Sequence, residues 1–213
     1  MEGYDEYDDL NINDTNLIEK YSNIDVDVLI NQTKPIEILM NDSSIIKPIT
    51  TKLKSRIIRL KNGLVVGMVS DPNIYKSGIA FGIPYGKNID LIPGFAHYAE
   101  HLFFGGSKNY IDNTIFWKVV NHVSGINNAM TDIDYTIYLF STFSSEFNET
   151  LKVFADMVKF PNVNKSYADN EINAVNSEFL LNNITTRVFL DILFDIGNQN
   201  NPVNKLGIGT IET

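Results

Sequence analysis

The sequence predicts an α+β fold, in which helices pack on a β-sheet that is rich in antiparallel strands. Strand-like runs at 56–69, 77–83 and 126–141 are interspersed with helix-like runs. They lack the regular alternation of strand and helix that parallel βαβ units require. A chain of 213 residues is long enough to bury a real core and corresponds to one domain or two small ones.

The N-terminal part of the chain has a distinct composition. Nine of the first thirty residues are acidic and only Lys20 is basic. Such a charge run predicts a solvated, weakly ordered extension over residues 1–45, followed by a folded domain over residues 46–213. A regulatory or docking arm is the alternative, and it has no support beyond the charge run.

The folded part is expected to open with a β-hairpin. Two β-rich runs at 56–60 and 64–69 flank a Lys-Asn-Gly segment. Asn62-Gly63 favours a type I′ turn, in which both central residues have positive φ. A third strand is expected at 77–83, because a Pro-Tyr-Gly turn follows it.

A helix is predicted from about Gly94 to the Gly-Gly pair at 105–106, which is a good C-terminal stop. Its apolar stripe indicates that it is at least half buried. The stripe consists of Phe95, Ala99, Leu102 and Phe103. A second helix is predicted over 113–122, with His122 as a structural residue that the helix dipole favours.

Two further strands are predicted at 126–131 and 135–141. Ser144 or Ser145 is expected to cap a helix that ends at Pro161. A last long helix is predicted to begin near Ser166.

The residues 97–101 read His-x-x-Glu-His, and this motif carries the chemistry. His97 and His101 are four residues apart, so both imidazoles project from one face of a helix. Two imidazoles at this spacing bind zinc, and a carboxylate from elsewhere completes a three-ligand catalytic site. Glu100 is placed to take a proton from water, the arrangement of an inverted zincin. The alternative is a helix with two surface histidines and a solvated glutamate.

Composition sets further bounds. The net charge of −9 argues against nucleic acid as a partner. No apolar run is long enough for membrane insertion, and no signal peptide is visible. The absence of cysteine fits a reducing compartment, so a cytoplasmic location is expected. Without cysteine, a four-ligand structural zinc site is a weak alternative.

Two segments carry a family resemblance. Residues 94–110, GFAHYAEHLFFGGSKNY, resemble the zinc helix of the insulinase (pitrilysin) family of metallopeptidases. Residues 171–178, EINAVNSE, resemble the segment that supplies the third zinc ligand of this family. The similarity runs from about residue 56 to the end of the chain. The expected fold is therefore an insulinase-type metallopeptidase domain, and the expected activity is zinc-dependent hydrolysis of peptide bonds.

The resemblance also implies roles for single residues. Glu178 is expected to be the third zinc ligand beside His97 and His101, and Glu171 a carboxylate that orients a ligating imidazole. Asn128, Ala129 and Met130 resemble the edge strand along which peptide substrates bind as an added strand. Met130 stands where the family pattern has an aromatic residue, which leaves the side-chain preference near the cleavage point open.

The resemblance finally implies an incomplete enzyme. Family members build this domain from a longer stretch than follows Arg56 here, and a second, C-terminal half supplies basic and tyrosine groups to the substrate. After Glu178 this chain has Arg187 as its only arginine and no tyrosine. We therefore expect an N-terminal fragment, truncated at the C-terminus, that needs the C-terminal half or a paired homologous half. A non-catalytic partner module is the alternative, which the intact ligand set with Glu100 disfavours.

Overall fold

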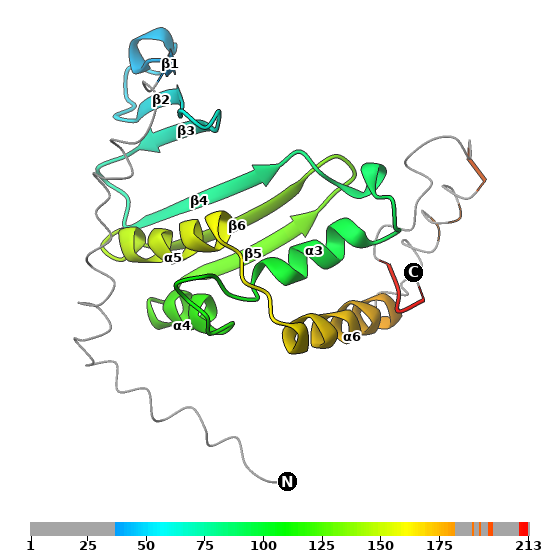
Figure 1. Ribbon diagram of the computed structural model, residues 1–213. Helices are drawn as coiled ribbons and strands as arrows, with labels where there is room; N and C mark the ends of the chain where they lie inside the picture. Colours follow the sequence, from blue (N-terminus) through cyan, green and yellow to red (C-terminus); the bar gives the residue numbers. More distant parts are fainter. Residues whose placement is uncertain (1–36, 182–188, 190–191, 193–195, 198–208, 213) are drawn as a thin grey trace. The chain divides into compact units, whose positions relative to one another are not determined.

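The computed structural model describes residues 37–181, 189, 192, 196–197 and 209–212 (Figure 1). The chain forms two compact units, one up to Asn73 and one from Ile74 onwards. Each unit contributes an antiparallel sheet, and the second adds helices, so the predicted α+β class is confirmed. Residues 1–36 of the predicted extension lie outside the described residues.

The first unit contains a three-stranded antiparallel sheet in the order β1-β2-β3. Its strands are β1 (Glu37–Met40), β2 (Lys54–Arg59) and β3 (Val65–Ser70), and a short 3-10 helix, η1 (Asp42–Ser44), follows β1. Strands β2 and β3 are the predicted hairpin. Strand β1 lies inside the predicted extension, where Glu37 pairs with Arg59 in the ladder and accepts a 2.9 Å hydrogen bond from its guanidinium. Part of that segment is therefore paired strand.

The turn between β2 and β3 differs from the predicted type I′ turn. Gly63 has a φ of 93°, but Ser124 is the only non-glycine residue with positive φ in the described part of the chain. The amide of Gly63 donates to the carbonyl of Leu60 (2.9 Å), and the amide of Leu60 donates to the carbonyl of Leu64 (2.8 Å). This pattern is a three-residue connection with glycine in the left-handed position. The type I′ prediction is wrong, because only one residue of the turn takes positive φ.

The sheet of the second unit has the order β4-β6-β5 and is antiparallel throughout (Figure 1). Its strands are β4 (Lys76–Ile83), β5 (Ile126–Thr131) and β6 (Thr136–Phe143). The strands predicted at 77–83, 126–131 and 135–141 are confirmed, with shifts of one or two residues. Strand β5 lies at one edge of this sheet, with β6 as its only partner among the described strands.

Helices lie along one side of this sheet in Figure 1. They are α3 (Phe95–Phe103), α4 (Ile115–His122), α5 (Phe147–Lys159) and α6 (Lys165–Leu181), with a 3-10 helix, η2 (Lys87–Ile89), before α3. The core between sheet and helices is aromatic. Phe140 of β6 lies 5.9 Å from the ring of Phe116 and 5.3 Å from that of Phe154. Apolar burial of this kind is the main stabilising term for the unit.

The predicted serine cap of α5 is wrong. The N-cap position is Glu146, and no side chain caps it. The amide of Ser144 instead donates to the carbonyl of Tyr75, and its hydroxyl lies 2.9 Å from that of Ser77. Ser144 therefore ties the start of β4 to the end of β6. The predicted end of α5 at Pro161 is confirmed, since the helix ends at Lys159.

Asp90 fixes the start of α3. Its side chain is buried, with 1% of the residue exposed, and both carboxylate oxygens accept the amide of Ala96, at 3.0 and 3.1 Å. The N-cap residue Gly94 has no side chain to do this. Asp90 thus satisfies one of the amides that a helix leaves unpaired at its N-terminus.

We expect Asp90→Ala to lower the free energy of unfolding by about 1–2 kcal/mol, because it removes this cap from a buried amide. Urea unfolding followed by circular dichroism measures the change. Asp90→Asn, which keeps an acceptor oxygen, should retain most of the stability. Equal unfolding midpoints for Asp90→Ala and the unaltered chain would contradict this role.

Candidate metal centre and adjacent pocket

The helices α3 and α6 bring two histidines and one glutamate together. His97 and His101 lie one turn apart on α3, and Glu178 comes from α6. One ligand atom from each residue can be chosen so that all three lie within 4.8 Å of one another. Within the described part of the chain, this is the only such group of three or more metal-ligating side chains. The exposed His122, at the end of α4, does not belong to it.

The distances in this cluster suit a tetrahedral metal ion. The Glu178 Oε2 atom lies 3.6 Å from Nε2 of His97 and 3.5 Å from Nε2 of His101. Zinc bonds of about 2.0–2.1 Å in tetrahedral geometry separate neighbouring ligand atoms by about 3.4 Å. The three donors are two imidazole nitrogens and one carboxylate oxygen, a set that zinc accepts in catalytic sites. The residues therefore fit the ion.

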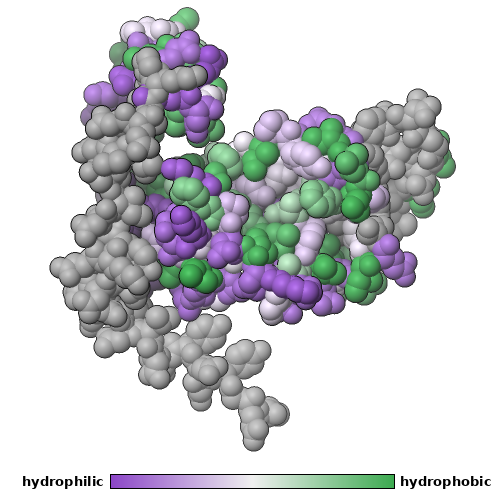
Figure 2. Space-filling view, in the orientation of Figure 1, coloured by the Kyte–Doolittle hydropathy of each residue, from purple (hydrophilic) through white to green (hydrophobic). Residues whose placement is uncertain are grey.

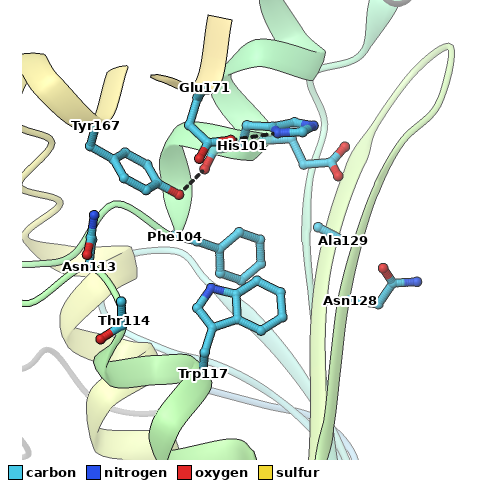
Figure 3. A pocket seen from close by; sticks show the side chains of 10 residues that line it. His101, Phe104, Asn113, Thr114, Trp117, Asn128, Ala129, Tyr167 and Glu171 are labelled. Atoms are coloured by element: carbon cyan, nitrogen blue, oxygen red, sulfur yellow. Dashed lines mark hydrogen bonds and ion pairs between the residues drawn. The ribbon is translucent and has the colours of Figure 1, made fainter. Parts of the chain in front are cut away.

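A second carboxylate from α6 supports the cluster. Glu171 Oε2 lies 2.9 Å from Nδ1 of His101, and Figure 3 shows this pair with Tyr167 beside it. A proton on Nδ1 that is donated to Glu171 leaves Nε2 unprotonated and turned toward Glu178. The hydroxyl of Tyr167 donates to the backbone carbonyl of His101 (3.2 Å), and burial, with the nearby charge of Glu171, raises the pKa of this tyrosine. Tyr167 therefore stays a neutral donor.

Glu100 lies beside the cluster and points to a different partner. Its Oε2 accepts a 2.5 Å hydrogen bond from the hydroxyl of Thr131, the last residue of β5. It is not a member of the group of three ligating side chains. Burial, with the nearby charge of Glu100, raises the pKa of Tyr138 on β6, so this residue also stays neutral.

A pocket of about 350 Å³ opens next to Glu100 and His101. Figure 3 shows Phe104 and Trp117 at its base and β5 along one side. Its lining includes Glu100, His101, Phe104, Asn113, Thr114, Trp117, Asn128, Ala129, Tyr167 and Glu171. An apolar floor beside a few convergent polar groups is typical of a ligand site.

The residues predicted to bind substrate divide between the two faces of β5. Asn128 and Ala129 both line the pocket, whereas Met130 does not. Side chains alternate along a strand, so Asn128 and Met130 share the more exposed face of β5, with 49% of Met130 exposed, and Ala129 and Thr131 share the other face.

Sequence reasoning assigned no role in the site to Thr131, Trp117 or Tyr167. Trp117 could have been found as the one tryptophan of the chain on a helix close to the motif. No local signal marks Thr131 or Tyr167, because their contacts join segments that are far apart in the sequence.

No helix in the described part of the chain is long and apolar enough to cross a membrane.

An α+β unit with a His-x-x-Glu-His helix, a carboxylate beside the two imidazoles and an edge strand next to them has the architecture of a metallopeptidase domain. The family model described as "Insulinase (Peptidase family M16)" matches residues 65–208. The chain therefore belongs to the insulinase family of peptidases.

Individual relatives agree with this assignment. The chain is 32% identical to insulin-degrading enzyme of Mus musculus over 179 residues, which is 81% of this chain and 18% of the relative. It is 32% identical to the A-factor-processing enzyme of Saccharomyces cerevisiae over 173 residues, 79% of this chain and 17% of the relative. The crystal structure of pitrilysin superposes with a TM-score of 0.77 at 28% identity, covering 83% of this chain and 19% of that structure. The chain thus spans less than a fifth of the length of these relatives.

Proposed function

We propose that this chain is the zinc-binding part of a metalloendopeptidase that hydrolyses peptide bonds in short peptides. The observation that carries the proposal is the convergence of His97, His101 and Glu178, whose ligand atoms all lie within 4.8 Å of one another. A zinc ion held by these residues would supply a Lewis acid that makes water nucleophilic near neutral pH.

Glu100 is the proposed general base. Its carboxylate accepts a proton from the attacking water as the water oxygen bonds to the scissile carbonyl carbon. The same carboxyl then gives the proton to the amine when the carbon–nitrogen bond breaks. Its place one residue before His101 on α3 puts it beside the cluster without using it as a ligand.

Substrate is proposed to lie along β5 as an added strand. Strand β5 is an edge strand of its sheet, so its outer backbone groups can pair with a peptide. Asn128, Ala129 and Met130 lie in the middle of this edge, and the first two also line the pocket beside Glu100. Backbone pairing fixes the direction of the peptide with little demand on its sequence.

Glu171 is proposed to act through His101. We expect Glu171→Gln to weaken zinc affinity about 10–100-fold, because an amide orients the imidazole less well than a carboxylate. Competition with a zinc-sensitive chelating dye measures the affinity. Asp169→Asn, on an exposed site of the same helix, is the matched control and should leave the affinity unchanged. Equal affinities for Glu171→Gln and this control would contradict the role.

Full activity is proposed to need a further half of the protein, because the relatives are much longer than this chain. The test joins residues 1–213 to the C-terminal half of a full-length family member and measures cleavage of a fluorogenic peptide. We expect the isolated 213 residues to be about 10²–10³-fold slower than the joined protein, because the further half is proposed to supply donors that stabilise the transition state. A chelator should abolish cleavage by the joined protein, and added zinc should restore it. Equal turnover by both proteins would contradict the need for a further half, and chelator-resistant cleavage would contradict the zinc mechanism.

The alternative is a non-catalytic module that binds peptides or a paired half. It predicts a folded chain without stoichiometric zinc, so the metal content of the purified chain separates the two functions. The complete set of His97, Glu100, His101 and Glu178 favours the enzyme.

A further inference from the structure

We infer that Thr131 is a positioning residue that holds the carboxylate of Glu100 in place for proton transfer. The inference rests on the proposed function, in which Glu100 is the general base. It adds a residue from the sheet to the proposed general base and metal ligands, which lie on the helices α3 and α6.

The contact joins two elements of the second unit. The Oγ1 atom of Thr131 lies 2.5 Å from Oε2 of Glu100, and the two residues are 31 positions apart in the chain. Only 8% of Thr131 is exposed, so water competes little for the hydroxyl. A hydroxyl that donates to a carboxylate in such a setting forms one of the stronger and shorter kinds of hydrogen bond.

The direction of this hydrogen bond follows from the two groups: an ionised carboxylate only accepts, so the hydroxyl of Thr131 donates. Thr136 faces Thr131 across the β5–β6 ladder, and its hydroxyl donates to the carbonyl of Tyr85 (2.9 Å). Each hydroxyl has a single proton, and the two hydroxyl oxygens are 3.4 Å apart. The proton of Thr136 is donated to Tyr85, and the proton of Thr131 is donated to the nearer acceptor, the carboxylate of Glu100. Glu100 therefore accepts this hydrogen bond at Oε2, and its other carboxylate oxygen can still accept a proton.

The turn that follows Thr131 is held by hydrogen bonds within the turn and from the segment before α3. The β5–β6 turn closes with a 2.8 Å bond from the amide of Asp132 to the carbonyl of Tyr135. The same turn accepts the amides of Lys87 and Asn88 at its carbonyls of Asp132 and Ile133, both at 3.0 Å. The side chain of Thr131 is β-branched, which restricts its χ1 angle. The hydroxyl is thus fixed before any substrate arrives.

A tight approach at Gly86 reinforces this support. A Cβ atom at position 86 would lie only 2.4 Å from the carbonyl oxygen of Ile133 and 2.5 Å from that of Asp132. Only glycine lets the two loops come this close. The segment around Gly86 therefore packs directly against the turn that follows Thr131 and restricts its movement.

The hydrogen bond from Thr131 orients the carboxylate of Glu100. A glutamate side chain has several rotatable bonds, and α3 fixes only its backbone end. The bond from Thr131 fixes one carboxylate oxygen, which leaves the other to take the proton from water. Positioning of this kind matters because small displacements of a catalytic group cost large factors in rate.

The test compares Thr131→Val, which keeps the shape and removes the hydroxyl, with Thr131→Ser, which keeps the hydroxyl. In the joined protein described above, we expect Thr131→Val to lower kcat for a fluorogenic peptide about 10–100-fold, with KM and zinc content unchanged. Thr131→Ser should stay within about 3-fold of the unaltered protein. Thr136→Val is the matched control, because it removes a buried hydroxyl that donates to the carbonyl of Tyr85 and not to Glu100. It should lower the melting temperature and leave kcat within about 3-fold.

A second readout needs no activity. In the zinc-free 213-residue chain, urea midpoints are measured for Thr131→Val, Glu100→Ala and the double variant. Contacting residues give non-additive shifts, whereas Thr131→Val combined with Glu149→Ala on the exposed side of α5 should be additive. Additive midpoints for Thr131 and Glu100 overturn the inference, as does a kcat of Thr131→Val equal to that of Thr136→Val.

The same assay separates failure of this inference from failure of the proposed function. If Glu100→Gln retains full turnover, or the unaltered protein shows none, the proposed function is wrong and the inference falls with it. If Glu100→Gln is inactive while Thr131→Val turns over normally, only the inference about Thr131 is wrong.

Discussion

Replacing Glu100 by glutamine is expected to lower the rate of peptide hydrolysis about 10²–10⁴-fold, because it removes the proposed general base and keeps the volume of the side chain. Zinc content should stay at one ion per chain, since Glu100 lies outside the ligating group. Initial rates on a fluorogenic peptide, with metal content measured on the same sample, check both expectations.

Two comparisons make this result specific. Glu149→Gln makes the same chemical change at an exposed site on α5, where the carboxylate pairs with Lys152, and should leave the rate unchanged. Glu178→Gln should weaken zinc binding itself. Equal loss of zinc in Glu100→Gln and Glu178→Gln would contradict the separate roles of base and ligand.

Replacing His97 and His101 by alanine is expected to abolish stoichiometric zinc binding and, with it, peptide hydrolysis. Removing two of three ligands leaves a single carboxylate, which cannot hold the ion at physiological concentrations. Elemental mass spectrometry of the dialysed protein measures the zinc, and circular dichroism verifies that the variant is folded.

His122→Ala is the control for this experiment. His122 lies at the end of α4 and outside the ligating group, so its replacement should leave one zinc ion per chain. A double variant of His97 and His101 that still retains one tightly held zinc ion would refute the proposed ligand set.

The sequence predicted the helices and strands of the second unit because their patterns are local. The spacing of His97 and His101 is itself a helical signal, and the Gly-Gly pair at 105–106 marked the end of α3. The third ligand could not be predicted from a local pattern. Nothing local distinguishes Glu178 from other glutamates, and only the resemblance to the insulinase family singled it out.

The features that sequence reasoning missed depend on tertiary contacts. Strand β1 is four residues long and obtains its partners from β2, so its short apolar run carried no clear signal. Ser144 forms hydrogen bonds with Tyr75 and Ser77 rather than capping the start of α5. Asp90 and Thr131 act on α3 from a preceding loop and from the sheet, and no spacing rule connects them to it.

The most direct test of the central claim is anomalous diffraction at the zinc absorption edge from crystals of the zinc-loaded chain. The account predicts one strong peak, at about 2.0–2.2 Å from Nε2 of His97, Nε2 of His101 and a carboxylate oxygen of Glu178. A peak at another position, or none at this cluster in fully loaded crystals, would contradict it.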